Sequence, residues 1–504
     1  MEIKKLENEL SQILLEIIEN EELINELTSQ VHQEYRLSAK NLLRYLILRS
    51  KDLRKYHGIL SDLGVSSLRS GEGYVFSNLY SVVRNINLIQ NTPFNIRKSI
   101  DIIGYTRSKE IIRAHANNLF NQLQKGHFTE IMVTLPDEAA EDKELIKKMV
   151  LNGMEIARIN LSHGNIDQWT QMVTLIREIE SETEQKVKIY MDLSGPKLRT
   201  SNIEIHNKKG EIKDSISVSI GEHLILSKEQ AVLKRPKTGE KKKLKAKVVK
   251  VLLDAVIDDA QIGDVVLFDD GMIKSSVVDK QENLLELVIT ECYKPKLGSQ
   301  KGINLPNTKL NLPALTKTDI TDLKFVCRHA DIVGYSFVRT ASDVSRLYRE
   351  LRKNKADQMG VVFKIENKDA FENLPEILLK GMERDKIGIM IARGDLAVEI
   401  GFERISEVQN EILWLCEAAH IPVIWATQVL ENLAKTGIPT RAEISDAALS
   451  AQAECVMLNK GPSIINAIQV LKNILVRMEG HSFKKKNELR PLNVAKRFID
   501  RLNN

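Results

Sequence analysis

The stretch VVFKIENKDAF, residues 361–371, decides how this chain folds. Three apolar residues lead into Lys364, Ile365 and Glu366, as in a short apolar strand that ends in charged side chains. Side chains two residues apart on a β-strand point to the same side, so Lys364 and Glu366 would project together. The sequence therefore predicts a strand that delivers a cation and a carboxylate to one place.

Seven more apolar runs of this kind flank that strand along the chain. They are EIMVTL (130–135), EIARIN (155–160), VKIYMDL (187–193), DIVGYSF (331–337), IGIMIA (387–392), IPVIWA (421–426) and ECVMLN (454–459). Helix-like segments such as EDKELIKKMVLNG (141–153) lie between most of them, and strands that alternate with helices imply a parallel sheet. Residues 129–196 and 302–480 together have the size of a closed (β/α)8 TIM barrel, about 250 residues.

The remaining segments predict two further parts. Residues 197–301 are rich in Val, Ile, Lys and Gly with turn signals, which indicates a small β-barrel lid domain inserted over the mouth of the barrel. Apolar residues at helical spacing before residue 125 predict an N-terminal α-helical region, by default a docking or oligomerisation module. The expected domains are 1–125 (helical), 126–196 with 302–485 (barrel), 197–301 (lid) and 486–504 (tail).

Composition excludes several classes of protein. With 43% apolar and 28% charged residues the chain is typical of a soluble globular protein. It has no apolar run long enough to cross a membrane, no signal peptide and no CxxC pair, so we expect a cytoplasmic protein. A net charge of +5 gives no case for nucleic acid. The basic segment 234–250 is either a solvated hairpin tip or an attractor of phosphate-rich ligands.

Polar side chains gather where the predicted strands end. They are Arg158, Asn160, Asp192, Ser336, Arg339, Lys364, Glu366, Arg393, Asp395, Thr427 and Asn459. Glu366 and Asp395 are hard oxygen ligands that suit Mg²⁺, and the cations around them require an anionic ligand. Backbone N–H groups at Gly394 could hold a carboxylate. Phosphoryl transfer or enolate chemistry fits this set, although each charged pair alone could be a plain strand-end ion pair.

Several motifs in order along the chain closely resemble the signatures of the pyruvate kinase family. They include ARINLSHG (157–164), MDLSGPKLRT (191–200), FDDGMIKS (268–275), LGSQKGINLP (297–306), KIEN (364–367), ARGDLAVEI (392–400) and ATQVLENLAKTGIPTRAEISD (426–446). The resemblance implies transfer of the phosphoryl group of phosphoenolpyruvate to ADP, giving pyruvate and ATP, with Mg²⁺ or Mn²⁺ as cofactor. It also implies a lid that closes on the nucleotide, and we expect a homo-oligomer.

The resemblance assigns a role to individual residues. Lys364, Arg158 and Thr427 look like the catalytic residues, and with Gly394 and Asp395 they would bind phosphoenolpyruvate. Glu366 and Asp395 resemble the metal ligands. Asn160, His163, Arg199 and Lys301 match nucleotide contacts, and Asn160, Ser162 and Asp192 match the monovalent-cation site.

The chain also departs from the family pattern. Lys197 stands where the family motif carries a glutamate, and its ammonium could replace the potassium ion, so we expect no requirement for K⁺. The eighth-strand motif is shortened to MLNKGP (457–462), and we expect the family's C-terminal regulatory domain to be absent. Two alternatives stay open: a catalytically silent scaffold or sensor, and a barrel enzyme that acts on pyruvate-type acids through a metal enolate.

Overall fold

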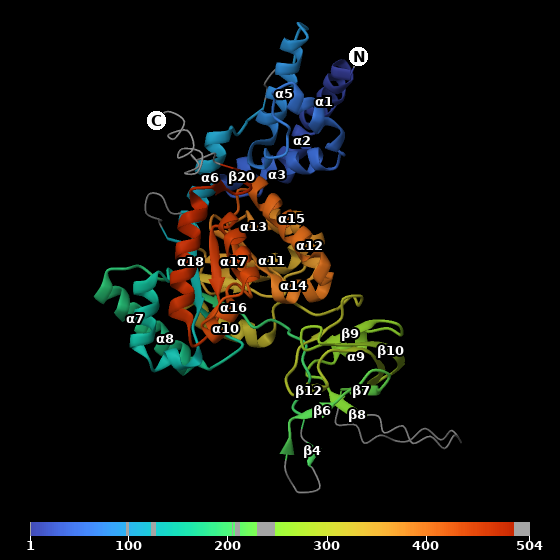
Figure 1. Cartoon of the computed structure of the whole chain (residues 1–504), viewed down its shortest axis with the longest axis vertical. Coiled ribbons are helices and arrows are strands. Elements are labelled where there is room, and N and C mark those ends of the chain that lie inside the picture. The colour runs from blue at the N-terminus through green and yellow to red at the C-terminus, as the bar shows by residue number, and fades with distance from the viewer. Residues whose placement is uncertain are drawn as a thin grey trace, which may run out of the picture.

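The structure is a computed structural model that describes residues 2–96, 100–121, 128–203, 205–206, 212–228 and 247–487. Three parts follow one another along the long axis of the molecule: N-terminal helices at one end, a central barrel, and an all-β domain at the other end (Figure 1). No helix among the described residues has the length and apolar character needed to cross a membrane.

The centre is a closed barrel of eight parallel strands. They are β1 (Glu130–Thr134), β2 (Ile156–Asn160), β3 (Lys188–Asp192), β14 (Ile332–Tyr335), β15 (Gly360–Ile365), β16 (Ile387–Ala392), β17 (Val423–Ala426) and β18 (Cys455–Leu458). Each strand pairs with its neighbour in chain order, and β1 closes the ring on β18. The eight predicted strands and the (β/α)8 TIM barrel are confirmed. The strands are buried almost throughout, which explains their nearly continuous apolar runs.

Helices surround the barrel. They are α7 (Lys143–Asn152), α8 (Ile166–Thr183), α10 (Lys317–His329), α11 (Ala341–Lys353), α12 (Lys368–Glu372), α13 (Leu374–Gly381), α14 (Arg393–Ile400), α15 (Ile405–Ala418), α16 (Glu431–Thr436), α17 (Arg441–Leu449) and α18 (Ile464–Glu479). Local sequence fixes several of their ends. Helix α10 begins with a reciprocal capping box between Thr316 and Asp319, and α7 ends at Gly153, whose φ of 118° suits glycine.

The insert between β3 and β14 is an all-β lid with its own apolar core. It contains β4 (Ile205–His206), β5 (Ile212–Lys213), β6 (Ser215–Ser217), β7 (His223–Ser227), β8 (Lys247–Lys250), the short α9 (Ala255–Asp259), β9 (Val265–Phe268), β10 (Ile273–Gln281), β11 (Leu284–Cys292), β12 (Lys296–Gly298) and β13 (Ile303–Asn304). In the described part of the insert, six of these strands form an open sheet in the order β13-β9-β10-β11-β7-β8. The predicted lid is therefore confirmed as a half-barrel. Most of the basic segment 234–250 lies outside the described residues.

The predicted N-terminal helical region is also confirmed. It comprises α1 (Glu2–Glu19), α2 (Glu21–Leu27), α3 (Arg36–Arg49), α4 (His57–Asp62), α5 (Val75–Ile89) and α6 (Tyr105–Leu119). This region packs against the end of the barrel opposite the lid (Figure 1). The Asn41 side-chain amide donates to the Ala418 carbonyl at 2.8 Å, and apolar residues of both parts form one continuous core.

Helix α6 closes the floor of the barrel, where the strands begin. Ala116, Leu119 and Phe120 join the inward-facing side chains of the barrel strands in one apolar cluster. Gly360 and Gly388 leave room for Leu119, because a Cβ atom on either glycine would lie 2.7 Å or 2.6 Å from a Leu119 methyl carbon. The floor is thus a packed apolar seal.

A short hairpin, β19 (Ser482–Phe483) and β20 (Lys486–Asn487), fastens the helical region to the barrel. Three successive lysines, two in its turn and one at the start of β20, each pair with a buried carboxylate from a different segment. Lys484 pairs with Glu454, Lys485 with Glu72, and Lys486 with Glu417 at 2.6 Å.

Candidate active site

Lys364 and Glu366, the pair that ends β15, lie together at the mouth of the barrel as the strand pattern predicts. The Lys364 ammonium is 2.9 Å from Glu366 Oε1, 2.9 Å from Ser336 Oγ and 3.6 Å from Asp192 Oδ2. Burial alone would lower the pKa of Lys364, but the charges of Asp192 and Glu366 outweigh it and raise the pKa. A permanently charged ammonium therefore stands in a site with almost no exposure to solvent.

Arg158 on β2 forms a second charged unit with Asp192 on β3. Its Nε is 2.6 Å and its Nη2 2.5 Å from Asp192 Oδ2, and its Nη1 donates to Thr134 Oγ1 at 2.8 Å. The Tyr190 hydroxyl donates to the other oxygen of Asp192 at 2.9 Å. Burial would raise the pKa of Asp192, yet Arg158 and Lys364 lower it, so the carboxylate is charged. Arg158 and Lys364 thus share this buried anion, and both side chains line the cavity in which an anionic ligand would bind.

Glu366 and Asp395 line a common cavity of about 200 Å³ together with Lys364, Arg158 and Thr427. Burial raises the pKa of Glu366 although Lys364 opposes it, and the nearby charge of Asp395 raises the pKa further. Two carboxylates that repel each other across a cavity favour a cation between them. No group of three or more His, Cys, Asp or Glu in the described part of the chain suits a metal. A pair of carboxylates completed by water and ligand oxygens fits Mg²⁺, which seldom sits in an all-protein cage.

Thr427 lies at the end of β17 in a left-handed backbone conformation, with φ of 63°. This conformation is strained for a β-branched residue. The Thr427 Oγ1 accepts from the backbone N–H of Gly394 at 2.8 Å, so this N–H, expected to hold a substrate carboxylate, is engaged by Thr427 here. The two residues lie side by side, as the prediction of a shared subsite requires.

The side chain of Arg393 has different partners from those that the sequence pattern suggested. We expected it among the cations around the metal, but its guanidinium forms a two-pronged ion pair with Asp446. It also donates to the carbonyls of Ala426, at 3.0 Å, and Thr427, at 2.6 Å. The guanidinium therefore fixes the strained turn at Thr427.

Lys197, at the start of the lid, pairs with Asp395. Its ammonium is 3.0 Å from Oδ1 and 3.3 Å from Oδ2 of that carboxylate. We expected it beside Asp192, which is instead paired with Arg158 and Lys364. Two other residues of the predicted monovalent-cation site, Asn160 and Ser162, line the same cavity as Lys197.

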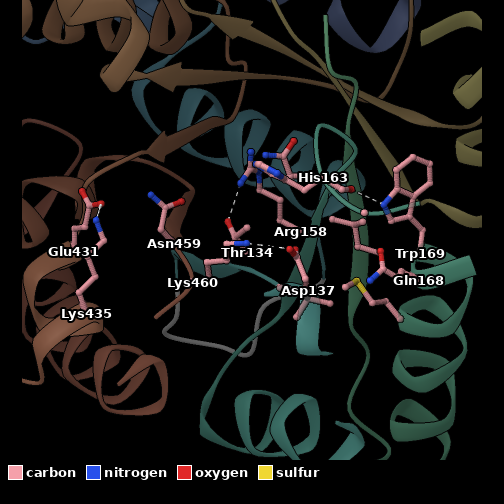
Figure 2. Close-up of a pocket in the computed structure, with 15 residues that line it drawn as sticks. Thr134, Asp137, Arg158, His163, Gln168, Trp169, Glu431, Lys435, Asn459 and Lys460 are labelled. Atoms are coloured by element: carbon pink, nitrogen blue, oxygen red, sulfur yellow. Dashed lines mark hydrogen bonds and ion pairs between the residues drawn. The ribbon is translucent and has the colours of Figure 1, made fainter. Parts of the chain in front are cut away.

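A second cavity of about 280 Å³ shares Arg158, Asn160 and His163 with the first. Figure 2 shows the residues that line it. This cavity contains the predicted nucleotide contact His163, whose backbone carbonyl accepts from the Trp169 indole N–H at 2.9 Å. Sequence reasoning missed the other polar residues of this cavity: Asp137, Gln168, Glu431, Lys435 and Lys460. They follow strand ends or occupy helices at spacings that carry no motif of their own.

The two remaining nucleotide contacts lie on the lid side. Arg199 lines the first cavity and donates to the Gln300 carbonyl at 3.0 Å. The Lys301 ammonium is 2.9 Å from Asp269 Oδ1, within the lid. The structure therefore brings Arg199 to the site, whereas Lys301 is held by the lid's own carboxylate.

Comparison with known proteins agrees with this arrangement. The family described as "Pyruvate kinase, barrel domain" matches residues 127–463. Pyruvate kinase of Bacillus licheniformis is 32% identical over 358 residues, and that of Geobacillus stearothermophilus 34% over 360 residues, each match covering 70% of this chain and 57% of the relative. A crystal structure of a pyruvate kinase from Cryptosporidium parvum superposes with a TM-score of 0.61 at 26% identity, covering 72% of this chain and 70% of that one.

The chain belongs to the pyruvate kinase family, because the family match covers well over half of its 504 residues. The resemblance inferred from the motifs is thereby confirmed. Members of this family typically use a divalent metal. The chain spans a little over half the length of the curated relatives it matches.

Proposed function

We propose that this protein transfers the phosphoryl group of phosphoenolpyruvate to ADP, giving pyruvate and ATP, as a glycolytic pyruvate kinase. One observation carries the proposal: the buried Lys364 ammonium is fixed by Ser336, Glu366 and Asp192 and opens on the cavity that Asp395 and Thr427 share. Preorganised cations in a site shielded from water stabilise the charge that develops on a transferring phosphoryl group.

Each residue then has a part in binding and orientation. Lys364 and Arg158 bind the phosphoryl group, and Lys364 also stabilises the enolate oxygen that remains after transfer. Thr427, with the backbone of Gly394 and Asp395, orients the carboxylate and methylene end of the substrate. Glu366 and Asp395 would hold Mg²⁺ or Mn²⁺, which when bound neutralises phosphate charge.

The nucleotide is proposed to occupy the cavity of Figure 2. Asn160 and His163 contact it from the barrel, and Arg199 and Lys301 approach from the lid. Lys435 and Lys460 also line this cavity, where they pair with the carboxylates of Glu431 and Asp137. Closure of the lid would exclude water, so that transfer to ADP outcompetes hydrolysis.

The protein is further proposed to work without added K⁺. The proposed monovalent-cation site consists of Asn160, Ser162, Asp192 and Lys197, and Lys197 already supplies a positive charge to the cavity. A cytoplasmic location and a homo-oligomeric state remain predictions, the former supported by four unpaired cysteines.

A coupled assay tests the function. Purified protein is incubated with phosphoenolpyruvate, ADP and Mg²⁺, with K⁺ varied from zero while ionic strength is held with a tetraalkylammonium salt. We expect pyruvate formation that depends on Mg²⁺ and ADP and that K⁺ changes little. Binding of phosphoenolpyruvate without turnover would instead favour a silent sensor, and strong activation by K⁺ would contradict the role given to Lys197.

A further inference from the structure

The carboxylate proposed to hold the divalent metal is engaged by a cation of the chain itself. Lys197 Nζ lies within 3.3 Å of both oxygens of Asp395. A bound Mg²⁺ lies about 2.0–2.1 Å from its oxygen ligands. The ammonium in this position would stand directly beside the metal, where like charges repel. The metal and the Lys197 ammonium would therefore compete for Asp395.

The other ammonium of the site is held differently. Lys364 has three partners, Glu366, Ser336 and Asp192, and its side chain is 10% exposed. The hydrogen bonds and ion pair found for Lys197 in the described residues are all with Asp395, and its side chain is 32% exposed. Solvent can therefore accept the Lys197 ammonium when it leaves, whereas displacing Lys364 would strand a buried charge. Of the two ammonium groups, Lys197 is therefore the one that a metal at Asp395 would displace.

Lys197 also begins the hinge of the lid. Two antiparallel segments form this hinge, with Ile303 N–H donating to the Leu198 carbonyl at 2.9 Å and Thr200 N–H to the Lys301 carbonyl at 2.9 Å. The Lys197–Asp395 pair thus joins the hinge to the start of α14 in the barrel. Exchange of the ammonium for a metal removes this link.

We propose that Lys197 is a built-in competitor of the divalent metal at Asp395, so that metal binds weakly until an anionic substrate enters. The substrate would offer the displaced ammonium a new partner in the same cavity. This inference rests on the proposed function, because it takes Asp395 as a metal ligand. It makes Lys197 a residue that couples metal binding to substrate binding.

Titration with Mn²⁺, followed by the electron paramagnetic resonance signal of the free ion, tests the competition without any turnover. In the absence of substrate and nucleotide, we expect Lys197→Met to bind Mn²⁺ about three- to tenfold more tightly than wild type. Phosphoenolpyruvate should then tighten Mn²⁺ binding more in wild type than in the variant. Lys197→Gln provides a second variant that keeps a polar side chain.

Lys294→Met is the matched control, because Lys294 is also a lid lysine paired with an aspartate, Asp269, at 2.6 Å. It should leave the Mn²⁺ affinity unchanged. If Asp395→Asn abolishes Mn²⁺ binding while Lys197→Met leaves its affinity at the wild-type value, the competition is overturned and the metal site stands. If Asp395→Asn does not weaken Mn²⁺ binding, the metal assignment is overturned, and the competition with it.

Discussion

Asp192 at the mouth of the barrel and Glu130 at its floor are both buried carboxylates, but the fold holds them in opposite ways. At the mouth, Asp192 lies against Arg158 and Lys364, which keep the pKa of Asp192 low despite burial. At the floor, burial raises the pKa of Glu130 to about 8, helped by the neighbouring Glu155, and that of Glu155 to about 7. The mouth therefore keeps charged side chains that can bind a ligand. At the floor, the carboxyl groups of Glu130 and Glu155 favour the neutral form beneath the apolar seal of α6. Barrel enzymes commonly divide catalysis and stability between these two ends.

The largest effect should come from removing the central cation of the mouth. We expect Lys364→Met to lower kcat a hundredfold or more, because a preorganised group that acts on transition-state charge is worth this much. The melting temperature should stay within a few degrees of wild type. Steady-state kinetics and a thermal melt provide the two readouts, and a rate within threefold of wild type would remove Lys364 from the catalytic residues.

A substitution at the floor of the barrel should have the opposite effect and lower stability without lowering kcat. Leu119→Ala removes a buried side chain from the seal and should lower the free energy of unfolding by about 2 to 3 kcal/mol while kcat stays within twofold. Urea denaturation measures the first and the coupled assay the second. Leu151→Ala, at a position 55% exposed on α7, is the control and should change neither. If Leu119→Ala lowers kcat strongly while the protein is still fully folded, the two ends of the barrel are not independent.

Lys364 and Leu119 show which contacts can be predicted from the sequence alone and which cannot. Lys364 and Glu366 were predictable because a period of two on a strand fixes which side chains meet. Leu119 belongs to an ordinary helical pattern, and nothing local indicates that its partners are Gly360 and Gly388, more than two hundred residues away.

Arg393 is an example within the site of a contact that the sequence alone could not predict. Its place at the end of a predicted strand suggested a cation beside the metal, but its guanidinium is held by Asp446 on a later helix. The nearby Lys197 was predictable as a cation of the site, whereas its pairing with Asp395, almost two hundred residues later, was not. Strand periodicity thus locates the site, and contacts between distant segments decide which charges face the ligand.

The dependence of stability on pH should distinguish the two ends further. Glu130 has a pKa of about 8 in the fold against an ordinary 4.5, so the stability it contributes is present below pH 4.5 and lost as pH rises through 8. From pH 6.5 to 8.5 we expect a loss of about 2 kcal/mol. Chemical denaturation across this range measures it. Glu130→Gln should flatten the decline, and an unchanged slope would contradict the assignment to Glu130.

His420 is also buried at the interface between α6 and the barrel, and it should affect stability at acidic pH. Burial lowers the pKa of His420 to about 3, and Ser108 Oγ lies 3.0 Å from its Nε2. The stability that depends on its neutral form is present above its ordinary pKa of about 6.5 and is lost as pH falls toward 3. The contribution of His420 to the free energy of unfolding should therefore decline below pH 6.5, where it opposes the gain that Glu130 gives down to pH 4.5.

The smallest effect should come from weakening the contacts that hold Thr427 in place. Asp446→Asn weakens the hold of Arg393 on the Ala426 and Thr427 carbonyls, and we expect kcat to fall about tenfold because misplacement of a substrate-orienting group slows the reaction. In a Thr427→Ala background the same change should add little, since the effect passes through Thr427.

Asp331→Asn is the control for that experiment. Asp331 pairs with Arg177 at 2.9 Å just before β14 begins, at the floor end of the barrel. It should change stability and leave kcat intact. Full additivity of the Asp446 and Thr427 changes would mean that Asp446 supports the fold in general.

The hairpin of Lys484–Lys486 has a consequence for the order in which the molecule assembles during synthesis. Ribosomes release a chain from its N-terminus, yet Asn41 finds Ala418 and Glu72 finds Lys485, 377 and 413 residues later. At about 5–20 residues per second, α3 and its neighbours wait for tens of seconds with their docking face uncovered. The helical region, although it is made first, therefore cannot complete its docking until the segments around Ala418 and Lys485 have been made.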